Sequence, residues 1–285
     1  MVLKKLKSYR ELVMFSHTLF SLPFALIGMI WAANGLPSGY TIFWILIALI
    51  GARNGANALN RIVDKDYDKK NPRTANRHLP KGLVKNYEVL AIVILCFSIF
   101  EIAAYMLNPI CFMLSPIALF LFVIYSYTKR FTWICHIVLG ITCGGAPVGA
   151  WLAVTGKFAL APIILGTVVT LWVAGFDIIY ATQDIDFDRK TGLFSIPAKF
   201  GLKGALFISS LFHFIMILLL ISLYFIMNSG LIYLTGIFIS AILLTLEHYI
   251  VSPANEKKMK IASYHINKVV SVLIFVFTVL DVFIS

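Results

Sequence analysis

Long apolar runs separated by short polar breaks dominate this chain of 285 residues. A helix needs about 20 apolar residues to cross a bilayer, and nine runs are close to that length. The expected spans are residues 13–34, 40–60, 88–107, 109–127, 132–155, 158–181, 204–226, 229–247 and 264–285. Joining the two runs that meet at Asn108-Pro109 would leave about 40 apolar residues, too long for one crossing. The pattern predicts an all-α, polytopic membrane protein of nine transmembrane helices, with residues 1–285 forming a single domain.

Composition agrees with a lipid environment. Hydrophobic residues make up 60% of the chain and charged residues 13%, whereas soluble domains carry about 25% charged residues. The four cysteines lie in apolar runs without a CxxC pair, which favours neither a disulfide framework nor a zinc site. The lipid bilayer is therefore the expected surrounding of most of the surface.

The basic residues indicate the orientation in the membrane. The formal net charge is +11, and nearly all Lys and Arg precede the first span or lie in every second connection between spans. The positive-inside rule then places the N-terminus and these loops in the cytoplasm. The charge therefore reflects membrane topology, and we expect no nucleic-acid partner. Because no transit segment precedes the first span, the expected membrane is the bacterial plasma membrane.

Seven of the 13 acidic residues gather in two short stretches at the expected cytoplasmic ends of two spans. In each stretch the polar residues recur at helical spacing and so share one helix face. The two stripes are Asn60, Asp64 and Asp68 (i, i+4, i+8) and Asp177, Asp184 and Asp188 (i, i+7, i+11). Clustered carboxylates repel one another and are costly to desolvate, and a divalent cation removes both penalties. Their oxygen atoms suit Mg²⁺, which binds a few carboxylates together with substrate phosphate oxygens.

Basic side chains beside the stripes indicate contacts to phosphate, which Arg can bind through two parallel hydrogen bonds. The candidates are Arg73, Arg77, Lys129, Arg130 and Arg189. A diphosphate bound at the membrane boundary, near the cytoplasmic face, points to a substrate with a lipid tail. Two alternatives are ordinary solvated helix ends and an ion-coupled transporter. Transporters, however, usually hold carboxylates near mid-membrane on discontinuous helices.

Three ordered motifs resemble those of the UbiA-type aromatic prenyltransferases. The pattern Asn-x-x-x-Asp-x-x-x-Asp at 60–68, followed by Arg-Thr-Ala-Asn-Arg at 73–77 and Leu-Pro-Lys-Gly at 79–82, is similar to the first signature. The pattern at 177–188 is similar to the second, and segment 125–130 to the Tyr-to-Lys-Arg stretch after the fourth helix. The resemblance covers nearly the whole chain. It implies a helical bundle with a central cavity open to lipid, and transfer of a polyprenyl group from its diphosphate to an aromatic ring carbon.

The resemblance also implies roles for the residues of these motifs. The Mg²⁺–diphosphate would be carried by Asp64, Asp68, Asp184 and Asp188, with help from Asn60. The diphosphate, or the carboxylate of the aromatic acceptor, would contact Arg73, Arg77, Lys129 and Arg130. Other members of the same family, such as haem, chlorophyll or ether-lipid prenyltransferases, are close rivals that should differ at the second motif.

The residues of these motifs are compatible with two different aromatic acceptors. Residues 73–77 resemble the 4-hydroxybenzoate polyprenyltransferases of ubiquinone biosynthesis. Residues 180–184 and Ser-Ile-Pro-Ala at 195–198 look more like the branch associated with the futalosine route to menaquinone, whose acceptor is 1,4-dihydroxy-6-naphthoate. Both acceptors are hydroxylated aromatic carboxylates, so the reaction class is the same for either.

A few further residues inside the spans are candidates for chemistry. Arg53 is an intramembrane arginine, expected to bind the acceptor's carboxylate or, alternatively, to pair with Asn57. Asp177, expected to be the most buried acid of its stretch, is a candidate proton acceptor, or else a further metal or water ligand. The ring face of Tyr180 would stabilise an allylic cation, unless the residue serves for packing. His136 is expected to be a packing histidine, with acceptor contact as the alternative.

Overall fold

The computed structural model describes residues 18–252 and 255–284, so residues 13–17 of the first expected span lie outside the described part. Within it, eight helices are long and apolar enough to cross a membrane, and a shorter apolar helix covers Leu22–Ala33. The all-helical, polytopic fold is thus confirmed. The ninth crossing and the orientation stay predictions. The chain divides into two compact units, unit 1 with Gly39–Tyr127 and unit 2 with Leu19–Ser38 and Thr128–Ser285.

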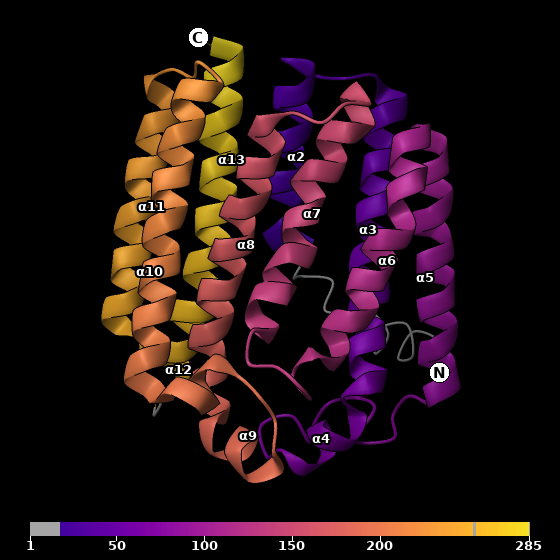
Figure 1. Cartoon of the computed structure of the whole chain (residues 1–285), viewed down its shortest axis with the longest axis vertical. Coiled ribbons are helices and arrows are strands. Elements are labelled where there is room, and N and C mark those ends of the chain that lie inside the picture. The colour runs from indigo at the N-terminus through magenta and orange to yellow at the C-terminus, as the bar shows by residue number, and fades with distance from the viewer. Residues whose placement is uncertain (1–17, 253–254, 285) are drawn as a thin grey trace. The chain divides into compact units, whose positions relative to one another are not determined.

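Unit 1 consists of two long apolar helices packed closely together, a third that follows them, and a short helix at one end (Figure 1). These are α3 (Gly39–Val63), α4 (Lys65–Lys70), α5 (Asn86–Leu107) and α6 (Pro109–Thr128). A Cβ on Gly51 of α3 would lie 2.7 Å from the Cys96 carbonyl oxygen of α5, so only glycine permits this approach. The expected break between α5 and α6 is confirmed, and the Asn108 side chain accepts a hydrogen bond from the Cys111 amide at 2.9 Å.

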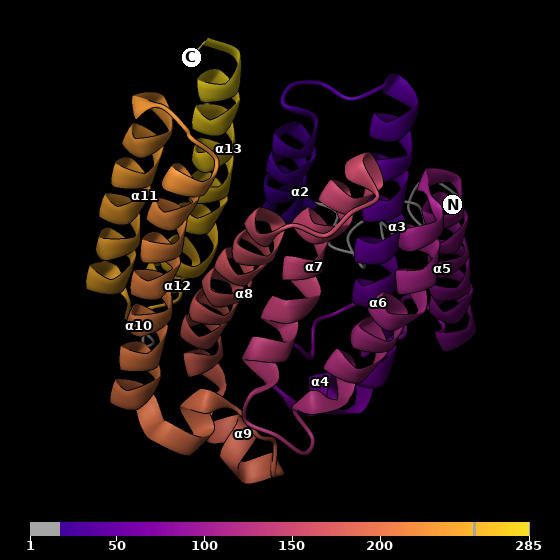
Figure 2. The same ribbon diagram turned by 45° about the horizontal axis from the view of Figure 1, so that its top comes forward.

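Unit 2 is built around one buried helix, α8, that packs against both α7 and α10 (Figures 1 and 2). Its helices are α2 (Thr18–Ala33), α7 (Cys135–Thr155), α8 (Leu160–Ala181), α9 (Ile185–Thr191), α10 (Ile196–Ile226), α11 (Leu231–Ile250), α12 (Glu256–Lys260) and α13 (Asn267–Ile284). Leu165, Val168, Val169 and Trp172 of α8 are fully buried. A Cβ on Gly144 of α7 would collide with the Gly166 carbonyl of α8, so the Gly-rich stretch of α7 serves close helix packing.

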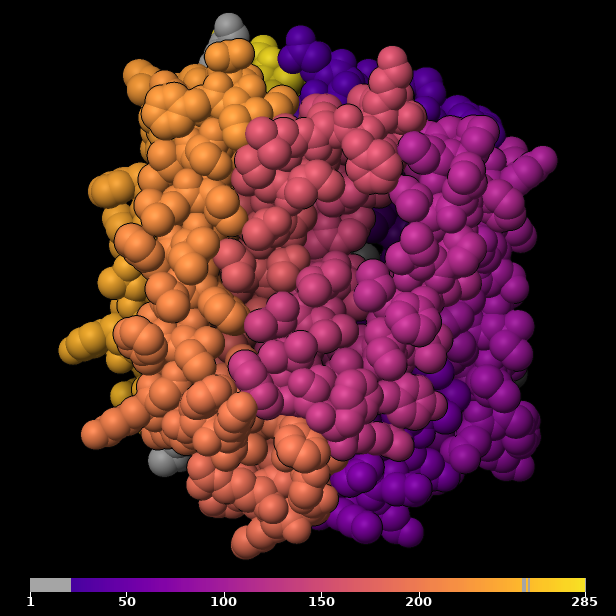
Figure 3. All heavy atoms as spheres, in the orientation of Figure 1, coloured from indigo at the N-terminus to yellow at the C-terminus, as the bar shows by residue number. Residues whose placement is uncertain are grey.

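Large apolar side chains on the outside of unit 2 match a lipid environment. Along α10 they recur at helical spacing as Phe207, Leu211, Phe214, Leu218 and Phe225, all exposed. This helix lies in the orange region of Figure 3. An apolar face of this size would be an aggregation hazard in water, whereas lipid tails solvate it.

Helix α10 begins eight residues before the expected span, and this difference has a local cause. The Ser195 side chain accepts a hydrogen bond from the Ala198 amide at 3.2 Å, which caps the helix start just before Pro197. At Gly201 the backbone has φ 68 and ψ 180, which interrupts the helix at that residue. The polar segment before the apolar run is therefore helical, and α10 contacts the preceding short helix α9.

Candidate active site

The first acidic stripe keeps its shared face although the helix that carries it is interrupted. Helix α3 ends at Val63 and α4 begins at Lys65, with Asp64 between them. The Asp64 amide still donates to the Asn60 carbonyl at 2.9 Å, and the Asp68 amide to the Asp64 carbonyl at 2.8 Å. The three side chains therefore follow one another at one-turn intervals, as the spacing predicts. The Asn60 side-chain amide also donates to the Asp64 carboxylate at 2.9 Å.

Asp68 is buried and bound by a cation from the loop that follows α4. Nη1 of Arg77 lies 2.6 Å from Oδ1 and 2.7 Å from Oδ2 of Asp68. The Thr74 hydroxyl donates to the Asp68 carbonyl at 3.1 Å, which holds the loop against the helix. Arg73, from the same motif, is exposed. The motif at 73–77 thus turns one arginine toward the carboxylate stripe and the other outward.

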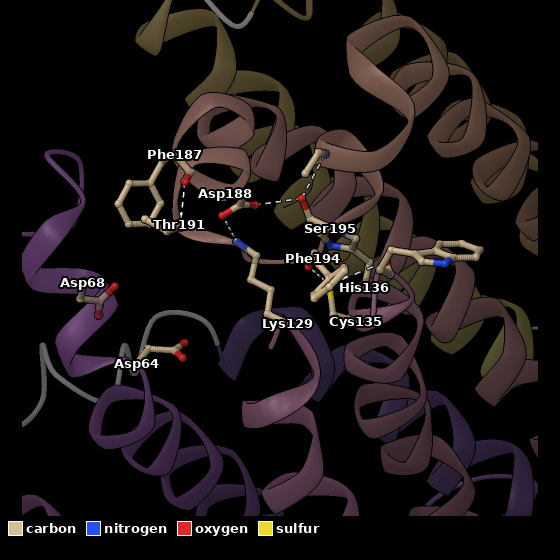
Figure 4. Close-up of polar contacts among 12 residues, drawn as sticks. Asp64, Asp68, Lys129, Cys135, His136, Phe187, Asp188, Thr191, Phe194 and Ser195 are labelled. Atoms are coloured by element: carbon tan, nitrogen blue, oxygen red, sulfur yellow. Dashed lines mark hydrogen bonds and ion pairs between the residues drawn. The ribbon is translucent and has the colours of Figure 1, made fainter. Parts of the chain in front are cut away.

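Asp188 forms the corresponding pair in unit 2. Its carboxylate is fully buried and accepts from Nζ of Lys129 at 3.0 Å and from the Ser195 hydroxyl at 2.8 Å (Figure 4). Burial lowers the pKa of Lys129, but the negative charge of Asp188 outweighs this effect and raises the pKa above its ordinary value. The Lys129 ammonium therefore stays charged near neutral pH. Its neighbour Arg130 is exposed.

The second acidic stripe differs from the expected continuous helix. Helix α8 ends at Ala181, a 3₁₀ turn covers Thr182–Asp184, and α9 follows. A 3₁₀ turn has three residues per turn, so it shifts the later carboxylates around the axis. The expectation that Asp177 is the most buried acid is wrong: its side chain is 28% exposed, whereas Asp184 is 6% and Asp188 0% exposed. Lys129 and Ser195 both contact the Asp188 carboxylate, which helps to bury it.

Asp177 has a partner that the sequence does not reveal. Nδ1 of His136, on α7, lies 2.7 Å from Oδ2 of Asp177 on α8. His136 is buried, with 2% of its surface exposed. Its other ring nitrogen, Nε2, is also buried and has no hydrogen-bond partner among the described residues. The expectation of a satisfied packing histidine is therefore wrong for this second nitrogen.

The remaining candidates keep their predicted places without a tested role. Arg53, Asn57 and Asn60 are at i, i+4 and i+7 along α3 and so share one face, and Arg53 is half-buried. Tyr180, at the end of α8, is 40% exposed. Ser195 contacts Asp188, whereas in the sequence it stands out only as part of the Ser-Ile-Pro-Ala motif. No signal in the sequence pairs it with Asp188.

The donor atoms in both units fit a magnesium ion. Mg²⁺ prefers oxygen ligands such as the carboxylate and amide oxygens that lie one helical turn apart here. In proteins it is usually bound by one or two carboxylates together with phosphate oxygens of the substrate. Among residues 18–252 and 255–284, no three His, Cys, Asp or Glu side chains converge enough to hold a metal ion by themselves. The cations beside Asp68 and Asp188 balance the carboxylate charge within each unit.

Comparison with known proteins identifies the family. The sequence profile of the UbiA prenyltransferase family matches residues 21–269. The chain belongs to the UbiA prenyltransferase family. The resemblance read from the motifs is thus confirmed, and the chain is a prenyl-transferring membrane enzyme, which favours the enzyme over the transporter alternative. A 4-hydroxybenzoate octaprenyltransferase of Photobacterium profundum is 28% identical over 76% of this chain and 78% of its own length.

Solved structures of UbiA proteins share the fold. The apo structure of a UbiA homolog from Aeropyrum pernix K1 is 34% identical, with a TM-score of 0.85, and the match covers 93% of this chain and 98% of that one. A UbiA homolog from Archaeoglobus fulgidus, bound to GPP and Mg²⁺, is 18% identical, with a TM-score of 0.74 over 96% of this chain and 99% of its own. The second likeness shows the fold alone.

Proposed function

We propose that this UbiA protein is an aromatic prenyltransferase of quinone biosynthesis. It moves a polyprenyl group from its diphosphate to a ring carbon of a hydroxylated aromatic carboxylate, either 4-hydroxybenzoate or 1,4-dihydroxy-6-naphthoate. The observation that carries the proposal is the same in both units: a buried carboxylate on the short polar helix that follows a long apolar one binds a cation, Asp68 with Arg77 and Asp188 with Lys129. The name of the Photobacterium relative supports an aromatic acceptor.

The carboxylates would hold Mg²⁺ and the cations the diphosphate. The proposed metal ligands are Asn60, Asp64, Asp68, Asp184 and Asp188, and the proposed phosphate contacts are Arg73, Arg77, Lys129 and Arg130. The Archaeoglobus homolog was solved with GPP and Mg²⁺ bound, which are a prenyl diphosphate and a metal ion of the kinds proposed here. When bound, the metal ion stabilises the negative charge that develops on the diphosphate. Arg77 in unit 1 and Lys129 in unit 2 would each add positive charge for phosphate oxygens, because each side chain already lies at a carboxylate of its own unit.

The other candidates would serve the acceptor and the carbon that is transferred. Arg53, with Asn57 one turn away on the same face, would bind the acceptor carboxylate. The ring of Tyr180 would face the allylic cation, whose charge is attracted to aromatic faces. Asp177 would take the proton that the acceptor loses. We further propose the bacterial plasma membrane as the location, with the site near its cytoplasmic face, which the basic loops support.

A transfer assay in membranes tests the proposal. Radiolabelled polyprenyl diphosphate and Mg²⁺ are offered with 4-hydroxybenzoate or with 1,4-dihydroxy-6-naphthoate, in parallel with the variants Asp64→Ala and Asp184→Ala. Prenylated product from one acceptor, absent in both variants, would establish the reaction and the acceptor. A folded wild-type protein that binds the diphosphate but modifies neither acceptor would sink the aromatic assignment. Folded protein that does not bind the diphosphate would remove the role of the carboxylate stripes.

A further inference from the structure

The contact between His136 and Asp177 has a direction. Nδ1 of His136 lies 2.7 Å from Oδ2 of Asp177, and with an ionised carboxylate, which only accepts hydrogen bonds, Nδ1 is the donor. The bond crosses from α7 to α8, and the two residues are 41 positions apart in sequence. The histidine lies on the buried side of this pair and the aspartate on the open side, with 2% and 28% of their side chains exposed.

The unpartnered nitrogen separates His136 from a histidine with a purely structural role. Buried polar atoms in folded proteins nearly always have hydrogen-bond partners. His213, equally buried in the same unit, follows this rule: its Nδ1 lies 3.0 Å from Nε2 of His248, and its Nε2 lies 3.3 Å from the Trp172 carbonyl oxygen. In His136 the buried Nε2 has no such partner among the described residues. The bond to Asp177 is therefore the main polar interaction of the ring.

We propose that His136 is a positioning residue that fixes the Asp177 carboxylate as the proton acceptor of the reaction. This inference rests on the proposed function. The bond from Nδ1 engages Oδ2 of Asp177, and 28% of the Asp177 side chain stays exposed, so the carboxylate can still be reached by a proton donor. A hydrogen bond from a buried, rigid ring restricts the carboxylate to one orientation, which pre-organises it for proton transfer.

The proton balance of the transfer requires such an acceptor. The bond between C1 of the prenyl group and the diphosphate oxygen breaks, and its electron pair leaves with the diphosphate. An electron pair of the acceptor ring forms the new bond to C1. The hydrogen on the attacked ring carbon then leaves as a proton to the Asp177 carboxylate, and the electron pair of the broken C–H bond restores the aromatic ring. The protonated carboxyl group returns the proton to water on its open side.

Two substitutions at His136 distinguish positioning through Nδ1 from simple packing. In His136→Asn the side-chain amide nitrogen occupies nearly the place of Nδ1, so the bond to Asp177 is kept. In His136→Gln the amide nitrogen lies nearer the place of Nε2, so the bond is displaced. We expect transfer by His136→Asn to stay within about tenfold of wild type and transfer by His136→Gln to fall by about 100-fold. The dissociation constant of the prenyl diphosphate, measured by equilibrium dialysis, should stay unchanged in both.

A double variant and a matched histidine complete the experiment. Asp177→Asn should lower transfer by about 100-fold or more, and adding His136→Gln to it should lower transfer no further, since the two residues act together. His213→Asn should lower thermal stability without changing the transfer rate per folded molecule. A His136→Gln rate equal to or above that of His136→Asn, or additive effects in the double variant, would overturn the positioning role. Inactive wild-type membranes would instead overturn the proposed function on which this role rests.

Discussion

Replacing Lys129 by Met tests how strongly the ion pair with Asp188 stabilises unit 2. The substitution keeps a side chain of similar length and removes only the ammonium group. Asp188 then keeps the Ser195 hydroxyl as its partner, with the carboxylate itself 1% exposed. Removing one member of a buried pair is destabilising because it leaves an uncompensated buried charge.

The size of the effect follows from the distance and the exposure. At 3.0 Å, two unit charges with an effective dielectric constant of about 20 attract by roughly 5 kcal/mol. The Lys129 side chain is 34% exposed, so water screens a large part of this attraction. We expect Lys129→Met to lower the free energy of unfolding by about 2 kcal/mol. This value lies between those typical of exposed and of buried ion pairs. That corresponds to a fall in Tm of roughly 4 to 8 °C for a chain of this size.

Thermal unfolding in detergent, followed by tryptophan fluorescence, measures this difference. Lys190→Met is the matched control, because Lys190 is exposed and surface substitutions usually change stability by less than about 0.5 kcal/mol. The double variant Lys129→Met, Asp188→Asn should recover part of the lost stability, since it also removes the buried charge. A single variant as stable as the control, or a double variant no more stable than the single, would refute the reasoning.

Three further predictions concern packing, charge and metal. Gly144→Leu should lower stability by about 1–3 kcal/mol because its Cβ meets the Gly166 backbone. Gly145→Ala, where nothing lies within 4 Å, should leave thermal unfolding nearly unchanged. Arg77→Lys should raise the KM for prenyl diphosphate about tenfold, since a lysine ammonium is a point charge and lacks the planar group with which an arginine binds two phosphate oxygens. Chelation by EDTA should abolish transfer, and Mg²⁺ should restore it better than Ca²⁺, which prefers larger sites.

The helices were largely predictable from sequence because a membrane span leaves a long apolar run. Long apolar runs bounded by Pro, Gly or charge gave the limits of α5 and α6 within about two residues. The same signal fails for α9 and the start of α10, where polar and charged residues form helices without an apolar run. There the Ser195 cap and the position of Pro197 determine the start of the helix, and both are local features that hydropathy does not weigh.

The candidate site was predictable where it depends on spacing along one helix. Asn60, Asp64 and Asp68 kept their common face because backbone hydrogen bonds continue through the interruption at Asp64. Contacts between helices were not predictable, since spacing carries no information about them. The pair of His136 and Asp177 joins α7 to α8 across 41 positions, and an isolated histidine in an apolar run gives no sign of its partner.

The ion pairs explain how carboxylates can be held at a membrane boundary before any substrate binds. Isolated buried charges are costly, and each pair satisfies its carboxylate with a cation from the neighbouring loop. On the proposed function, Asp68 and Asp188 would each help to hold Mg²⁺, and Arg77 and Lys129 would each be available to bind phosphate oxygens. Each pair therefore neutralises its buried carboxylate within its own unit.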